Sequence, residues 1–363
     1  FSNVSFGDVT DNFDKKRIPL SAAQREKRQE KYRYYGAQGV IDWVDDYIFD
    51  GTYLLIAEDG ENLKSKKSNI AQLASGKFWV NNHAHVIQCK KGYDIRYLCY
   101  LINLTDLSGY ITGSAQPKLS QSSMNAIVLP MPKFEIQKEV ADFIEKFDKK
   151  IQINEKVNDN LQQQASAIYQ AWFEEFLLSG GSCPSTWKHG ILADIANITS
   201  GKRPSVKFFE MTENAVIPIV GAASIMGYTS ESNHTDKILV TGRVGTHGVI
   251  QRFSSPCWTS DNTLVITSDL YEYTYQLLKR IDYHSMNRGS TQPLITQSDM
   301  NKVPILIPDS ETPNNFELLA GKLMEQYQSN LLESRKLAEL RDTLLPKLIS
   351  GEIDVSNLSL IHI

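Results

Sequence analysis

The 363-residue sequence has few cysteines and no long apolar run. Its four cysteines, Cys89, Cys99, Cys183 and Cys257, lie far apart and form no CxxC pair, which argues against a zinc site or a disulfide framework. No apolar run approaches the roughly 18 residues that span a membrane, and no secretory apolar segment opens the chain. These absences fit a protein of a reducing cytoplasm, although a first residue other than methionine leaves open where the natural chain begins.

Common catalytic signatures are also absent. The sequence has neither a Gly-x4-Gly-Lys-Ser/Thr phosphate loop nor a Gly-x-Ser-x-Gly nucleophile elbow. His83 and His85 would share one face of a strand, but no third ligand stands nearby. We therefore interpret them as a structural or solvated pair and predict no metal site. A hydrolase is the weakest interpretation of this chain.

What is present is typical of a folded protein, with 41% apolar and 10% aromatic residues and enough length for two domains. The net charge of −4 is unevenly distributed. Residues 1–132 and 179–308 carry net charges of +2 and +1, whereas 133–178 and 309–363 carry −3 and −4. Any nucleic-acid surface is therefore expected on the two mildly basic segments.

One block of sequence occurs twice. Residues 113–132 (GSAQPKLSQSSMNAIVLPMP) and 289–308 (GSTQPLITQSDMNKVPILIP) share nine of twenty positions without a gap, 176 residues apart. Weaker matches continue upstream, with Gly36 answered by Gly221 and Trp79 by Trp258. Because a long helical pattern follows each block, the repeat indicates duplication of a unit that consists of a globular module and a helix.

The two modules, residues 1–132 (module 1) and 187–312 (module 2), contain short apolar runs separated by turn signals. These runs predict a mixed, mainly antiparallel β structure. One amphipathic helix is expected over 95–104, and the polar stretch over 21–33 fits either a helix or a loop. The Gly- and Ser-rich residues 179–186 predict a linker.

Residues 133–178 and 313–363 follow the modules and repeat apolar residues in heptads, as paired helices do. A helix from about residue 132 to 176 would be about 65 Å long, and we expect Pro346 and Gly351 to end the last helix. Polar residues interrupt both seams, where a buried Asn sets register and partner choice. The residues assigned to this spacer or to its partners are Phe147, Ile151, Asn154, Asn158, Leu161, Leu323, Asn330 and Leu337. The predicted fold is thus α+β, with two similar β-rich modules joined by an antiparallel coiled-coil spacer.

At four places the chain resembles the specificity subunit of type I restriction–modification enzymes. These are the two Gly-Ser-x-Gln…Met-Asn…Pro blocks, the helix opening at 136–141 (IQKEVA), the start of module 2 at 187–195 (WKHGILADI), and the ending at 340–353 (LRDTLLPKLISGEI). Together they cover essentially the whole chain in the expected order.

The resemblance implies that each module is a target recognition domain that reads half of a split, asymmetric site on double-stranded DNA. The helices would fix the gap and dock two N6-adenine methyltransferase subunits, to which restriction/translocase subunits bind. S-adenosylmethionine and ATP are then expected only on those partners, and the chain itself would be non-catalytic. The absence of an Asn/Asp-Pro-Pro-aromatic motif agrees with that role.

Candidate DNA contacts lie near the start of each module, in its loops and in the repeated block. The basic residues fit phosphate contact or ordinary surface charge, and Arg243 could pair with guanine unless its glycine-rich loop is only a hairpin turn. Because the block is shared while the half-sites should differ, its glutamines fit a structural or phosphate-contacting role. The candidates are Lys15, Lys16, Arg17, Lys64, Lys66, Lys67 and Gln116 in module 1, and Lys202, Arg203, Arg243, Thr246, His247 and Gln292 in module 2. The alternative is a scaffold whose modules bind protein or carbohydrate.

Overall fold

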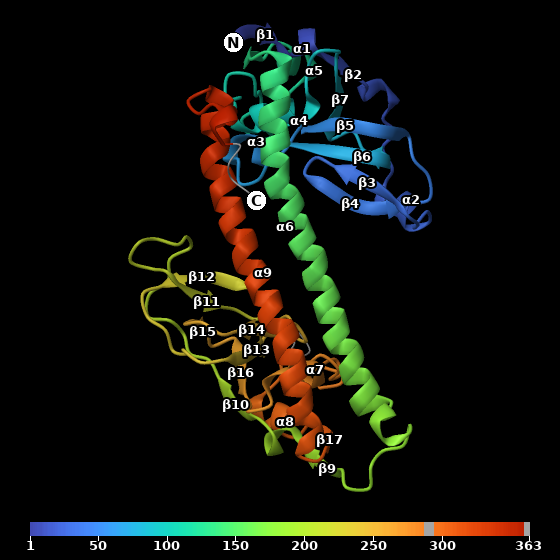
Figure 1. Cartoon of the computed structure of the whole chain (residues 1–363), viewed down its shortest axis with the longest axis vertical. Coiled ribbons are helices and arrows are strands. Elements are labelled where there is room, and N and C mark those ends of the chain that lie inside the picture. The colour runs from blue at the N-terminus through green and yellow to red at the C-terminus, as the bar shows by residue number, and fades with distance from the viewer. Residues whose placement is uncertain (287–293, 359–363) are drawn as a thin grey trace. The chain divides into compact units, whose positions relative to one another are not determined.

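The computed structural model describes residues 1–286 and 294–358, which divide into two compact units. Unit 1 comprises Phe1–Ile153 with Glu333–Ile363, and unit 2 comprises Asn154–Leu332. Each unit therefore holds one β-rich module and half of each of the long helices α6 (Phe134–Tyr169) and α9 (Glu311–Ser350) (Figure 1). No helix among the described residues is long and apolar enough to cross a membrane.

Module 1 is built on a six-stranded sheet in which every pairing is antiparallel except that of β3 with β6. In spatial order the strands are β2 (Thr10–Asn12), β7 (Ala84–Cys89), β5 (Phe49–Ala57), β6 (Ala71–Val80), β3 (Tyr32–Gly36) and β4 (Gly39–Val44). A separate pair, β1 (Ser2–Ser5) with β8 (Val128–Met131), joins the two ends of the module. The mixed, mainly antiparallel sheet predicted from the sequence is confirmed.

Short helices complete module 1. The amphipathic helix predicted over 95–104 is confirmed as α4 (Ile95–Leu104), and the Asp94 side chain caps its first turn. The undecided stretch over 21–33 contains α2 (Ala22–Glu26) and the start of β3. The remaining short helices are α1 (Phe6–Val9), η1 (Asp14–Lys16), α3 (Asn62–Ser65) and α5 (Gln121–Asn125).

Strand β5 lies in the middle of module 1 because both of its faces are apolar. Leu54 and Ile56 point into the main core with α4 and α6, whereas Tyr53 and Leu55 pack on the opposite face against Phe78. Side chains alternate between the two faces of a strand, so this continuous apolar run predicts a strand covered on both sides.

Module 2 repeats this arrangement with one strand divided. Its sheets run β10 (Asn197–Ser200), β16 (Thr263–Thr267), β13 (Ile238–Gly242), β14 (Gln251–Phe253) and, separately, β12 (Ile225–Thr229), β11 (Ile217–Val220), β15 (Trp258–Thr259). Strands β14 and β15 together take the place of β6. A closing pair, β9 (Lys188–Ile191) with β17 (Pro304–Ile307), answers β1 with β8, while α7 (Tyr271–Leu278) and α8 (Gln297–Asn301) answer α4 and α5.

The duplicated frame extends to single hydrogen bonds. Trp79 lies beside Tyr34 in a parallel pairing, and Trp258 lies beside Ile219 in the same way. The Trp79 indole N–H donates to the Ile18 carbonyl at 2.6 Å, and that of Trp258 donates to the Lys202 carbonyl at 2.7 Å. The predicted match of Trp79 with Trp258 is therefore confirmed.

In unit 2 the halves of α6 and α9 pack antiparallel around buried amides. The Asn330 Nδ2 donates to Asn158 Oδ1 at 2.8 Å, and Asn158 Nδ2 donates to the Tyr327 carbonyl at 3.2 Å. Asn154 Nδ2 lies 3.4 Å from the Asn330 carbonyl. One turn further along, Leu161 packs with Met324. Asn therefore occupies buried seam positions, as the heptads predicted.

In unit 1 the other halves of the two helices also run antiparallel. Phe147 lies in the core of module 1 together with Leu348 and Ile349 of α9, and Arg341 pairs with Asp148 at 2.6 Å. Of the assigned spacer residues, Phe147, Asn154, Asn158, Leu161 and Asn330 are buried, and Ile151, Leu323 and Leu337 are half-buried. Leu161 and Leu323 belong to one apolar cluster between the helices, and Leu337 packs against the core of module 1. Contact of these residues with a partner subunit stays a prediction.

The predicted helix ends were only partly right. Gly351, with a φ of +78°, directly follows the last residue of α9, so its role as a helix end is confirmed. Pro346, however, lies inside α9, which continues to Ser350. Leu348 and Ile349 are buried in the core beyond it, and this burial offsets the hydrogen bond that proline cannot donate. The first long helix ends at Tyr169, earlier than predicted, and a π-helical turn (Gln170–Glu174) follows it.

Candidate nucleic-acid interface

Module 1 brings together three segments that carry candidate DNA contacts: η1, the loop that follows β5, and the start of the repeated block. The Lys64 amine donates to the carbonyls of Gly113 and Ser114 at 3.0 and 3.2 Å. The backbone N–H of Leu119 donates to the Glu58 carbonyl at 2.8 Å. Residues that are far apart in sequence therefore form one continuous surface region.

Arg17 belongs to the interior of this region, and its assignment to the DNA-binding set is corrected. Its side chain is 14% exposed and pairs with Glu58 at 2.8 Å. The same nitrogen donates to the Ala84 carbonyl at 2.7 Å. Because its hydrogen-bonding groups are directed inward, Arg17 stabilises the module, while its neighbours Lys15 and Lys16 are exposed.

The lysines after β5 are all exposed, but two of them are tied to backbone. The amine of Lys66 donates to the Thr105 carbonyl at 2.7 Å, in addition to the bonds of Lys64. Lys67 and Gln116 are exposed and are the remaining candidates in this region. Lys118 also lies there, 53% exposed and 3.3 Å from Glu58, although the sequence did not single it out.

Gly113 shapes the first turn of the repeated block. Its φ of +81° favours glycine, and a Cβ at this position would lie 2.3 Å from the Gln116 carbonyl oxygen. This close approach gives a structural reason for the Gly-Ser-x-Gln pattern. The matching turn of module 2, including Gln292, lies outside the described residues.

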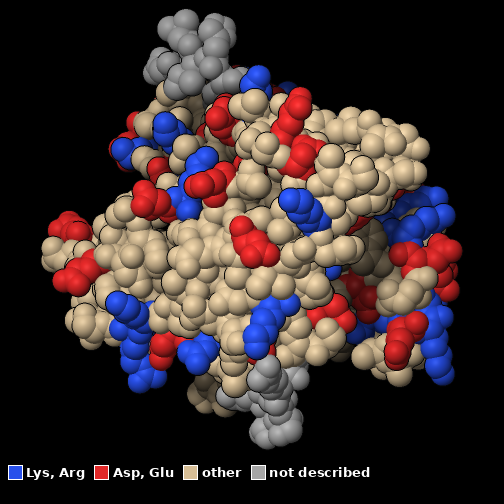
Figure 2. Space-filling view, turned by 90° about the horizontal axis from the view of Figure 1, so that it is seen from below, with Lys and Arg blue, Asp and Glu red and all other residues tan. Residues whose placement is uncertain are grey.

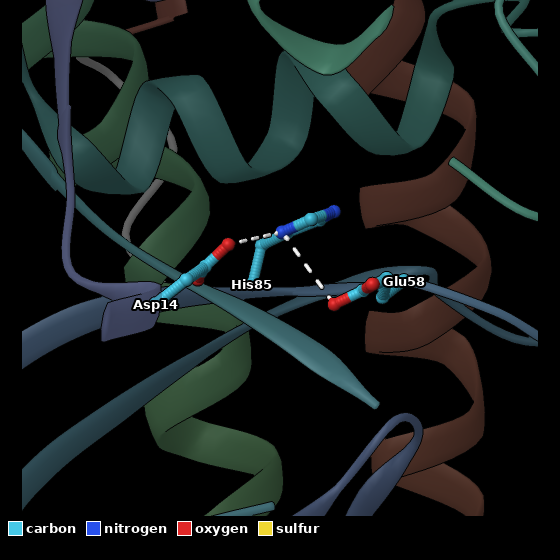
Figure 3. Close-up of side chains that lie close together, drawn as sticks. All are labelled: Asp14, Glu58 and His85. Carbon is cyan, nitrogen blue, oxygen red and sulfur yellow. Dashed lines mark hydrogen bonds and ion pairs between the residues drawn. The ribbon is translucent and has the colours of Figure 1, made fainter. Parts of the chain in front are cut away.

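Beneath the surface region of module 1 lies a charge cluster of Asp14, Glu58 and His85 (Figure 3). The His85 ring is 1% exposed; its Nδ1 lies 2.6 Å from Asp14 Oδ2 and its Nε2 lies 2.8 Å from the Leu119 carbonyl. The other Asp14 oxygen accepts the Val86 backbone N–H at 2.8 Å. This cluster ties η1, β7 and the repeated block to one another.

The expectation that His83 and His85 share one face of a strand was wrong, whereas their interpretation as solvated or structural histidines agrees with their positions. His83 stands in the exposed turn before β7 and contacts Asp59, whereas His85 is buried within the strand. The ligand atoms of Asp14, Glu58 and His85 lie within 4.8 Å of one another. Their carboxylate oxygens, however, already accept hydrogen bonds or ion pairs from His85, Arg17 and Lys118. The cluster is therefore a set of internal ion pairs, and a buried His in the apolar strand 84–87 was the signal for it.

Both carboxylates of the cluster are held in their charged form. Burial, the largest single influence, raises the pKa of Asp14, but hydrogen bonding with His85, Asn12 and the Val86 N–H together with the charge of His85 brings the net pKa below the usual value. Burial is likewise the largest influence on the pKa of Glu58 and raises it, but hydrogen bonds from Arg17 and Lys118 and the charges of His85 and Arg17 together bring the net pKa below its usual value. Both groups are thus ionised at neutral pH.

Module 2 keeps the same backbone frame but replaces this chemistry. The Ile295 N–H donates to the Arg243 carbonyl at 3.0 Å, just as that of Leu119 donates to Glu58. Arg243 therefore stands at the Glu58 position. The pairing of Thr241 with Leu264 matches that of Ile56 with His85, so leucine stands at the His85 position.

The loop over 242–248 in module 2 is a tight turn. A Cβ on Gly242 would lie 1.9 Å from the Thr246 carbonyl oxygen, and His247 Nδ1 lies 3.1 Å from the Gly242 carbonyl. The His247 ring is thus part of the turn, and its Nε2 is buried, which disfavours it as a base contact. Thr246 is exposed and Arg243 is half-buried.

The other candidates of module 2 lie at its surface. Lys202 is exposed while its carbonyl accepts the Trp258 indole N–H. The Arg203 side chain is 84% exposed and lies 3.4 Å from Asp261. Figure 2 shows basic and acidic side chains interspersed over the face that it presents, without a broad patch of one sign. Strong electrostatic attraction of DNA by this face alone is therefore not expected.

Two modules with one frame and different loops, each continuous with a long helix, define a duplicated recognition protein. Residues 1–163 and 184–341 match the model of the type I restriction modification DNA specificity domain, and the chain belongs to this family. Nothing in these matches favours a scaffold that binds protein or carbohydrate.

Individual relatives agree with this assignment. The chain is 27% identical over 349 residues to the type I restriction enzyme MjaIX specificity subunit of Methanocaldococcus jannaschii, covering 84% of this chain and 80% of that protein. It is 33% identical over 112 residues to the putative specificity subunit S.HindORF215P of Haemophilus influenzae, which covers 31% and 29%. A crystal structure of a type I system S subunit from M. genitalium has the same fold, with a TM-score of 0.61 at 15% identity over 96% of this chain and 95% of that one.

Proposed function

We propose that this chain is the DNA-reading subunit of a type I restriction–modification complex, in which each module reads one half of a split, asymmetric site. The observation that carries the proposal is the contrast between a shared frame and a divergent surface. The backbone bond made by Glu58 recurs at Arg243, and the strand position of His85 recurs at Leu264. Two modules that held the same ligand would have no reason to differ there.

In this proposal the exposed cations grip phosphates and the divergent loops contact base edges. Lys15, Lys16 and Lys67 are the phosphate contacts of module 1, because their amines are exposed beside the repeated block. Arg243 in module 2 reads guanine, since its planar guanidinium can donate two bonds to the base edge. Thr246 is exposed on the same turn and contacts the neighbouring base pair or phosphate.

The catalytic work falls to partner subunits. Two N6-adenine methyltransferase subunits would supply S-adenosylmethionine chemistry, and restriction/translocase subunits would supply ATP-driven cleavage. The paired helices α6 and α9 hold the spacing between half-sites. Since each module carries only a small net positive charge, DNA binding by the isolated chain should be weak and salt-sensitive. A cytoplasmic location in a bacterium or archaeon accompanies this role.

Methylation mapping tests the proposal directly. DNA modified by the chain together with a methyltransferase partner should carry N6-methyladenine at a two-part motif with a fixed gap. Exchange of the loop over 242–248 should change one half of the motif and leave the other half intact. Methylation that is independent of sequence, or a single undivided motif, would contradict the proposal.

A further inference from the structure

The charge cluster of module 1 has a hydrogen-bonding requirement that no neutral form of His85 can meet. Its two ring nitrogens face the Asp14 carboxylate at 2.6 Å and the Leu119 carbonyl at 2.8 Å. Both partners are acceptors, and a hydrogen bond needs a hydrogen on one side. A neutral imidazole carries one N–H, whereas the imidazolium carries two.

A proton on Asp14 would be the alternative source of the second hydrogen. Asp14 is held as a carboxylate by the His85 ring, by Arg17 at 3.5 Å and by the backbone N–H of Val86. Among the described residues, the other charged group paired with the ring is Glu58, at 3.9 Å, which is itself paired with Arg17 and Lys118. With the Asp14 carboxylate and the Leu119 carbonyl both acting as acceptors, the hydrogens of the two bonds must come from the ring.

Three segments of the candidate interface depend on this ring. Asp14 opens η1, the helix that carries Lys15 and Lys16. The Leu119 carbonyl belongs to the repeated block, three residues from exposed Gln116. Glu58 precedes the loop that carries Lys67. A change of charge on this buried side chain would therefore loosen the joint between η1 and the repeated block.

Module 2 provides an internal comparison. Leu264 stands at the position of His85 and Arg243 at that of Glu58. Leu264 is fully buried in an apolar cluster, so no titrating ring links the corresponding segments there.

We propose that His85 is a positioning residue for DNA recognition by module 1 and that it works as a doubly protonated imidazolium joining η1 to the repeated block. The proposal rests on the proposed function for its DNA readout. Recognition of one half-site then weakens as the pH rises and the ring loses its second proton, while recognition of the other half-site does not.

The protonation state can be measured without DNA. The full chain, labelled with ¹⁵N on histidine rings, should show both nitrogens of His85 protonated at neutral pH, and His85→Gln assigns the signal. The exposed ring of His83 is the matched control two residues away. A neutral His85 tautomer at pH 7 would overturn the proposal, whatever the chain does with DNA.

The positioning role is then tested with the complex of this chain and its methyltransferase partner. DNA duplexes are altered in one half-site at a time, and affinity is measured from about pH 5 to about pH 9, which covers the range in which histidine side chains commonly change charge. Discrimination at one half-site should fall by up to about tenfold as the pH rises, which corresponds to the loss of one charge-assisted hydrogen bond. His83→Gln should leave this profile unchanged.

Asp14→Asn separates positioning from folding. The Asn oxygen can accept the Val86 N–H, and its Nδ2 can donate to an unprotonated Nδ1 of His85. A neutral His85 ring can then make both of its hydrogen bonds. This variant should therefore retain discrimination at both half-sites, and that discrimination should not change with pH. A profile as steep as that of the unaltered chain would refute the positioning role. A different outcome separates the two proposals. If the unaltered chain shows a doubly protonated His85 but its complex binds no DNA site specifically, the proposed function is refuted and the protonation assignment still holds.

Discussion

The buried amides between α6 and α9 make the energetics of the spacer measurable. Asn158 and Asn330 are 5% and 6% exposed, and their side chains are joined by a hydrogen bond of 2.8 Å. The other polar atom of each side-chain amide also has a partner. Asn158 Nδ2 donates to the Tyr327 carbonyl, and Asn330 Oδ1 accepts from Gln326 at 2.8 Å. Truncation of either Asn therefore leaves buried polar atoms without a partner.

We expect Asn330→Leu to lower the free energy of unfolding of unit 2 by about 1–3 kcal/mol, the cost of an unsatisfied buried amide. Asn158→Leu should cost a similar amount. The double variant should recover most of the loss, because two leucines can pack in the seam with no polar atom left unpaired. Urea denaturation of the four proteins, followed by helical circular dichroism, gives the coupling energy of the pair.

A free energy of unfolding of each single variant within about 0.5 kcal/mol of that of the unaltered chain would show that the amide pair does not stabilise the spacer. Losses that simply add in the double variant would likewise contradict the expected coupling. A matched control is Leu332→Ala on α9, whose side chain is 56% exposed and whose truncation should matter little. Recovered stability with a less uniform DNA gap would show that the amides set helix register.

Three further predictions concern the modules. Arg17→Met should lower the free energy of unfolding by about 2–3 kcal/mol, because Glu58 would remain buried beside fewer cations. Lys15→Met is the comparison: it should leave the unfolding midpoint unchanged and lower the salt slope of DNA binding by about one. Arg243→Ala should relax discrimination at a single base pair of one half-site by about 1–3 kcal/mol, measured by competition between altered duplexes; an equal loss at every position would contradict base reading. Because the folded-state pKa values of Asp14 and Glu58 are both lowered, the stability that these carboxylates contribute is present at neutral pH and lost as the pH falls through their folded-state pKa values. Acid titration of Asp14→Asn should show a shallower loss of stability than that of the unaltered chain, and a steeper one would contradict this sign.

The duplicated frame could be predicted from sequence because it depends on local and periodic signals. Trp79 and Trp258 are matched by a repeat whose offset drifts only slowly along the modules, from 185 residues at Gly36 and Gly221 to 176 residues in the repeated block. The heptads place Phe147 and Asn330 at the helix seam. Each of these signals is contained in a few neighbouring residues. Pro346 was misjudged because burial of the following Leu348 and Ile349 in module 1 is a tertiary effect.

The candidate site was predictable only in its exposed cations. Asp14 lies in η1, Glu58 follows β5 and His85 lies in β7. No spacing along the chain indicates that these three residues are in contact. Arg17 looked like a surface cation for the same reason, since its internal partner lies 41 residues away. Long-range polar contacts carry no periodic pattern, so their partners become visible only once the sheet order is known.

The residues that the two repeated blocks share have structural roles, and these roles do not involve the choice of DNA sequence. Met124 and Met300 are fully buried at equivalent positions, and Gly113 is required by a backbone contact. Identity within the block is therefore explained largely by packing and turn geometry, which both modules need alike. The two modules differ at the residue next to the block. The carbonyls of Glu58 and Arg243 accept the same backbone hydrogen bond from the block, but their side chains carry opposite charges. Since opposite charges at one position are not expected to prefer the same base edge or phosphate, we expect discrimination between the half-sites to begin at the border of the block and not within it.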